Sequence, residues 1–97
     1  MSHNERPFIT VDIERRGYGR RYTSLPVDDL RRDGFAIDFT GAYIRPEHID
    51  IRPGDVVRWR ENGRLVQAEV TSVQLEGLVM QVQVTGAHLL PPDAFYP

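Results

Sequence analysis

The chain contains no cysteine and no lysine. Without cysteine there is no disulfide framework, no thiolate nucleophile and no thiolate metal site, so we expect packing alone to hold the fold together. Without lysine, all twelve basic residues are arginines. Arginine favours fixed, planar contacts with carboxylates, phosphates or aromatic faces. A GC-rich gene would produce the same bias, so the arginine excess alone does not define a partner.

Long apolar runs and a strong net charge are also missing. No run approaches the roughly 20 residues that span a bilayer, and Met1 to Pro7 is too polar for a secretory signal. The formal net charge is −2 at pH 7, which gives no global field that would draw the protein to nucleic acid or a membrane. We therefore expect a protein of the cytoplasm, or of a particle assembled there, with no membrane partner.

Residues with catalytic or metal-binding chemistry are sparse. His3, His48 and His88 are too scattered for a local metal-binding spacing. Ser24 and Ser72 lack the Gly-x-Ser-x-Gly context of a nucleophile elbow, and neither glycine-rich phosphate motif occurs. The sequence therefore predicts no catalytic residue, no cofactor, no metal and no enzymatic activity.

A length of 97 residues corresponds to one domain. We expect a flexible N-terminus over residues 1–6, a β-barrel core over residues 7–86 and an extended C-terminal tail over residues 87–97. A chain this short buries only about 60–65% of its unfolded surface, so partner contacts could supply part of its order.

Alternating apolar and polar residues predict several short strands. The first covers Pro7 to Arg15. Three turn signals separate the later ones, namely Pro53-Gly54 as a type II turn, Asn62-Gly63 as a tight hairpin and a bend at Glu76-Gly77. The residues expected to face the core are Ile9, Val11, Ile13, Phe35, Ile37, Phe39, Val57, Trp59, Val66, Ala68, Val70, Leu78, Met80, Val82 and Val84.

Two segments carry helix signals. Ser24 is a candidate N-cap for a short helix over residues 26–33, with Asp28 and Asp29 favoured by the helix dipole and Gly34 as the stop. Pro46 opens a single helical turn that ends at Ile49, after the short extended piece 43–45. The predicted fold is mainly β, a small SH3-like barrel or sandwich with one short helix and extended termini.

One segment concentrates basic and aromatic residues, and we expect an exposed loop or hairpin bend there. Arginines beside tyrosines suit a protein neighbour with acidic groups, since both are favoured interface anchors. They also suit a phosphate backbone with stacked bases. A solvated loop that pairs loosely with Glu14, Asp28 and Asp29 is the third interpretation. The candidate partner-binding residues are Arg15, Arg16, Tyr18, Arg20, Arg21 and Tyr22.

The C-terminal tail is apolar and proline-rich. Alternation stops after Gly86, and the prolines disfavour a continued strand. Four large side chains in such a stretch either pack back on the barrel or dock on another subunit. Leu89, Leu90, Phe95 and Tyr96 are therefore further candidate partner-binding residues.

The order of parts over residues 43–84 resembles the small barrel of bacteriophage head–tail joining proteins. The residues concerned are Tyr43-Ile44-Arg45, a helical turn, Ile51-Arg52-Pro53-Gly54-Asp55-Val56-Val57, Gly63, Val70-Thr71-Ser72-Val73 and Glu76-Gly77. The arginine-rich segment and the tail have no counterpart in that pattern. The resemblance implies a virion neck or stopper subunit that forms a ring, seals a portal and offers a docking surface for the tail.

Two functions follow as expectations. The first is a non-enzymatic structural or assembly protein that contacts other protein subunits, including its own copies in a ring if it is a connector. The second is a small nucleic-acid-binding or regulatory barrel that uses residues 15–22.

Overall fold

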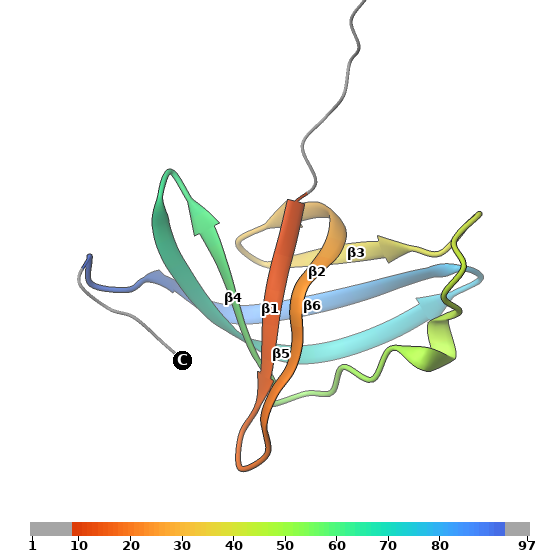
Figure 1. Cartoon of the computed structure of the whole chain (residues 1–97), viewed down its shortest axis with the longest axis horizontal. Coiled ribbons are helices and arrows are strands. Elements are labelled where there is room, and N and C mark those ends of the chain that lie inside the picture. Colours follow the sequence, from red (N-terminus) through yellow and green to blue (C-terminus); the bar gives the residue numbers. More distant parts are fainter. Residues whose placement is uncertain (1–8, 93–97) are drawn as a thin grey trace, which may run out of the picture.

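The computed structural model describes residues 9–92, which form one closed antiparallel barrel of six strands with the order β1-β2-β3-β6-β5-β4 (Figure 1). This confirms the predicted small, mainly β barrel. A three-residue 3-10 turn, η1 (Pro46–His48), is the only helix of the described chain, and no helix there could span a membrane. The strands are β1 (Ile9–Arg15), β2 (Gly19–Arg31), β3 (Gly34–Asp38), β4 (Val56–Glu61), β5 (Arg64–Glu76) and β6 (Val79–Leu89).

The interior is filled by the residues that the alternation pattern placed there. Val11 and Ile13 are fully buried on β1, and Trp59 is buried on β4. Two assignments were wrong. Leu78 is half exposed, because it lies in the turn before β6 begins, and Ile9 at the start of β1 is exposed. The confirmed core residues are Val11, Ile13, Phe35, Ile37, Phe39, Val57, Trp59, Val66, Ala68, Val70, Met80, Val82 and Val84.

Two of the three turn predictions are confirmed, and the third turn lies one residue later than predicted, at Gly77 and Leu78, because Glu76 still pairs with Val79 in the β5–β6 ladder. The Asp55 N–H donates to the Arg52 carbonyl at 3.0 Å, and Gly54 between them has φ +95°, as the third position of a type II turn requires. Asn62 and Gly63 both have positive φ and form a two-residue connection between β4 and β5, the geometry that suits a tight hairpin. The predicted helical turn is η1. In the predicted extended piece before it, residues 43 and 44 form a bend, whereas Arg45 has extended backbone.

The helix predicted over residues 26–33 is wrong, because this segment belongs to β2. Ser24 and Asp29 both have positive φ and lie where the strand register shifts. Each shift adds a residue that has no cross-strand partner. The bulge at Asp29 puts Val27 and Leu30 on the same inner face although they are three residues apart. Two apolar residues three positions apart are also typical of one face of a helix, which is why the sequence pattern predicted a helix here.

The end assigned to the barrel core was also wrong. β6 does not stop at Gly86 but continues to Leu89, which pairs with Val66 of β5. A register shift in this part of the β5–β6 ladder interrupts the alternation, which is why the sequence pattern ended early. The predicted flexible residues 1–6, and Phe95 and Tyr96 of the tail, lie outside the described residues.

Candidate functional site

The arginine-rich segment forms the hairpin between β1 and β2, which projects at the bottom of the view in Figure 1. Arg15 pairs with Gly19 across the ladder, and the Tyr18 N–H donates to the Arg15 carbonyl at 3.0 Å. The prediction of a hairpin bend is therefore confirmed. We call residues 15–22 the arginine hairpin, with its base at Arg15, Arg21 and Tyr22 and its tip at residues 16–20.

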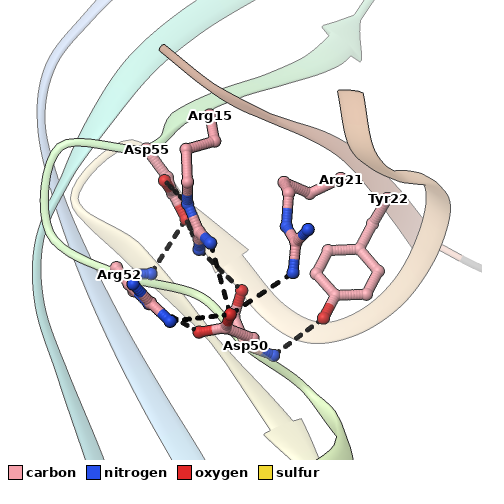
Figure 2. A network of polar contacts seen from close by, with 6 residues as sticks. All are labelled: Arg15, Arg21, Tyr22, Asp50, Arg52 and Asp55. Atoms are coloured by element: carbon pink, nitrogen blue, oxygen red, sulfur yellow. Dashed lines mark hydrogen bonds and ion pairs between the residues drawn. The ribbon is translucent and has the colours of Figure 1, made fainter. Parts of the chain in front are cut away.

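Asp50, in the segment before β4, fastens the base of the arginine hairpin (Figure 2). Its Oδ2 accepts from Arg15 at 3.2 Å, from Arg21 at 3.3 Å and from Arg52 at 3.2 Å, and its Oδ1 accepts from Arg52 Nε at 2.9 Å. The backbone N–H of Asp50 donates to the Tyr22 hydroxyl at 2.7 Å. The Asp50 carboxylate thus accepts hydrogen bonds from three guanidinium groups.

Asp55 provides the second anchor and is only 2% exposed. Its Oδ1 accepts from Arg15 Nε at 2.9 Å, and its Oδ2 accepts from Arg15 Nη2 at 3.0 Å and from the Arg52 N–H at 2.9 Å. The backbone of Asp55 also joins the sheet, since its carbonyl accepts from the Val70 N–H at 2.8 Å. A bidentate pair of this kind fixes the orientation of Arg15 as well as neutralising its charge. Hydrogen bonds to Asp55 raise the pKa of Arg15 above its already high ordinary value, so Arg15 stays charged.

The network makes stability depend on acid pH. Hydrogen bonds from Arg52, and then from Arg15, lower the pKa of Asp50. Arg32 lowers the pKa of Glu61, and the Thr40 N–H lowers that of Asp38. A carboxylate with a lowered folded-state pKa contributes stability above its unfolded pKa, and this contribution is lost as pH falls through the folded value.

We therefore expect the urea midpoint to fall as pH drops below about 4, the ordinary carboxyl range. Urea titrations at a series of pH values between about 7 and about 2 measure this. Asp50→Asn removes one of the carboxylates concerned and should flatten the profile while lowering the midpoint at neutral pH. An unchanged profile in this variant would mean that Asp50 does not contribute to the acid dependence.

The anchored base leaves the tip of the arginine hairpin presented to solvent. Tyr18 is 83% exposed. Arg16 lies on one side of it and pairs with Glu69 of β5 at 3.2 Å, where both side chains are largely exposed. Arg20 follows on the other side and is exposed as well. The structure thus separates the six predicted residues into an anchored group (Arg15, Arg21, Tyr22) and a presented group (Arg16, Tyr18, Arg20).

The tail residues lie elsewhere. Leu89 is 42% exposed and pairs with Val66, and the Leu90 N–H donates to the Leu65 carbonyl at 2.8 Å. Arg64 donates to the Leu90 carbonyl at 2.7 Å. Leu89 and Leu90 therefore continue the pairing of β6 with β5 and do not contact the arginine hairpin.

Sequence reasoning missed Asp50 and Asp55, and named Glu14, Asp28 and Asp29 as acidic partners instead. Asp50 and Asp55 are 35 to 40 residues from Arg15 along the chain, and sequence spacing cannot show such a contact. One signal was available. An acid directly after Pro53-Gly54, at the entry to an apolar strand, faces the interior and needs a cationic or N–H partner.

Within residues 9–92, no group of three or more histidine or acidic side chains is placed to hold a metal ion. The fold and the arginine hairpin together define the class of this protein. It is a small closed β-barrel that exposes basic and aromatic side chains at the tip of one hairpin. Comparison with protein-family models, with curated proteins and with solved structures gave no match.

Proposed function

We propose that the protein is a non-enzymatic assembly subunit that contacts other protein subunits, copies of itself among them, through the tip of the arginine hairpin. The observation that carries this proposal is Tyr18, which is 83% exposed at the tip of a hairpin whose base is fixed. Tyrosine and arginine are the residue types that most often dominate binding energy at protein interfaces. A preformed hairpin also loses little conformational entropy on binding.

The charge arrangement favours a protein partner with acidic groups over nucleic acid. Asp50 and Asp55 compensate the base of the arginine hairpin, and Glu69 stands beside Arg16 at the tip. An acidic side chain next to the presented arginine repels a phosphate backbone, whereas a neighbouring subunit can match both signs. The resemblance of residues 43–84 to head–tail joining proteins supports a ring-forming connector of a virion as the particular assembly.

The test compares full-length chains by light scattering coupled to size-exclusion chromatography. The variant Arg16→Ala/Tyr18→Ala removes the presented anchors, and we expect it to weaken assembly at least ~30-fold, as loss of about 2 kcal/mol at an interface anchor implies. Arg31→Ala is the control, because Arg31 is an exposed arginine at the far end of β2 from the hairpin tip and pairs only loosely, at 3.7 Å, with Asp33.

If the double variant assembled as well as the wild type, the arginine hairpin would not be part of the interface. Binding of double-stranded DNA that weakens steeply with salt, and is lost in the double variant, would favour the nucleic-acid-binding barrel instead.

A further inference from the structure

A cluster of exposed apolar side chains lies at the end of the barrel where β5 turns into β6. Leu75 and Leu78 are 53% and 50% exposed there, and Ile44 from the loop after β3 is 51% exposed. These three side chains line one groove of about 390 Å³, together with Pro46 of η1. We call it the end groove. The segments that line it, namely the loop after β3, η1 and the β5–β6 turn, lie on the right in Figure 1.

The end groove has the composition of a contact surface. Large apolar side chains clustered at one place are uncommon on a monomer unless something covers them. Arg45 and Glu47 also line the groove. Arg45 is exposed and has no acidic partner among residues 9–92, so its guanidinium group can pair with a carboxylate of the occupant. A second apolar groove of about 280 Å³ adjoins the first, because Ile44, Ala42 and Phe39 line both. The occupant should therefore supply more than one apolar side chain and an acidic group.

The C-terminal segment 93–97 has this chemistry. It reads Asp-Ala-Phe-Tyr-Pro and contains two aromatic residues, Phe95 and Tyr96, next to the acidic Asp93. We propose that this segment of one copy binds the end groove of a second copy, with the aromatic side chains on Ile44, Leu75 and Leu78 and Asp93 paired with Arg45. The inference rests on the proposed assembly function and names one of its contacts.

Chain length excludes the same contact within one molecule. Leu89 pairs with Val66, near the start of β5, whereas Leu75 is near the end of that strand. These positions are about 30 Å apart at roughly 3.3 Å per strand residue. The six residues that follow Leu90, up to Tyr96, span at most about 20 Å when fully extended. The C-terminal end of β6 lies on the left in Figure 1, opposite the β5–β6 turn. A fully extended segment that follows it is therefore too short to reach the end groove of its own chain.

A contact between two different surfaces of identical chains is heterologous, so each subunit donates a tail and accepts another. Repetition of such a contact closes into a ring when the rotation permits, and otherwise gives a filament. A head-to-tail contact of this kind agrees with the ring expected for a connector. The two contacting surfaces, the tail and the end groove, need not resemble each other.

Two full-length variants test the two sides of this contact one at a time. Phe95→Ala/Tyr96→Ala keeps the end groove but loses the donor side chains, and Leu78→Asp keeps the tail but places a charge in the groove. Leu78 lies in a turn and is half exposed, so the barrel should tolerate the change, which far-UV circular dichroism checks. Ile9→Asp is the matched control, since Ile9 is 47% exposed and lies outside the end groove.

We expect light scattering to show a wild-type oligomer larger than a dimer, monomers for each variant alone and a dimer for their equimolar mixture, which can form a single junction. Ile9→Asp should keep the wild-type size. Variants that retain the wild-type oligomer, or a mixture that stays monomeric, would overturn the tail-to-groove contact while the assembly function stands. A wild-type chain that is monomeric at every concentration would contradict both.

Discussion

Replacement of Asp55 by alanine is expected to lower the free energy of unfolding by about 3 kcal/mol, the scale for removing one partner of a buried, hydrogen-bonded ion pair. The substitution leaves the Arg15 side chain, which is 14% exposed, without its bidentate acceptor. It also leaves the Arg52 N–H without its carboxylate acceptor. Asp50 can still accept from Arg15, which keeps the loss below that of a fully isolated buried charge. Urea unfolding followed by tryptophan fluorescence of Trp59 measures the change.

Glu69→Ala provides the matched control. Glu69 also accepts from an arginine, Arg16, but both side chains are largely exposed, and such pairs contribute at most about 1 kcal/mol. The comparison therefore separates a buried ion pair from an exposed one in the same barrel. If the two variants lost equal stability, Asp55 would not be an anchor of the hairpin base.

A comparable loss of about 3 kcal/mol is expected for Gly34→Ala, at the upper end of the range for overpacking. Gly34 is buried in β3 opposite Gln83 of β6. A Cβ atom at this position would meet the Val82 carbonyl oxygen, a backbone atom of the neighbouring strand. Because a backbone carbonyl in a hydrogen-bonded ladder cannot turn away, β3 and β6 must separate locally. The urea midpoint again reports the effect.

Gly63→Ala distinguishes crowding from backbone strain. A Cβ at Gly63 meets nothing within 4 Å, but its φ of +83° is unfavourable for alanine. This costs about 1 kcal/mol. A Gly34→Ala protein as stable as Gly63→Ala would show that β3 and β6 are less closely packed at this point than the structure has them.

The barrel was largely predictable because its interior follows a two-residue alternation wherever strands run without bulges. Val66, Ala68 and Val70 are an example, and all three are buried. The two errors in strand extent share one cause. At Asp29 and near Gly86 an irregularity breaks the period, so that one strand resembled a helix and another seemed to end. Gly34, interpreted as a helix stop, is a glycine required by close packing.

The candidate site was predictable only in part. The basic and aromatic residues of the arginine hairpin stand together in the sequence, and their exposure at the tip follows from a three-residue loop between Arg15 and Gly19. What the local pattern cannot show is that Arg15 and Arg21 turn toward Asp50, because that contact depends on how the segment before β4 passes the hairpin. The end groove is likewise assembled from two segments that are distant in the sequence, the loop with Ile44 and the β5–β6 turn with Leu75 and Leu78.

The central claim, that this barrel works by assembly with other subunits, is tested most directly by light scattering of the full-length wild-type chain over a wide concentration range. The account predicts a discrete oligomer whose mass is a fixed multiple of the 11.2 kDa chain and which dissociates on dilution. A mass that stays at the value of a single chain at the highest concentration reached would contradict it.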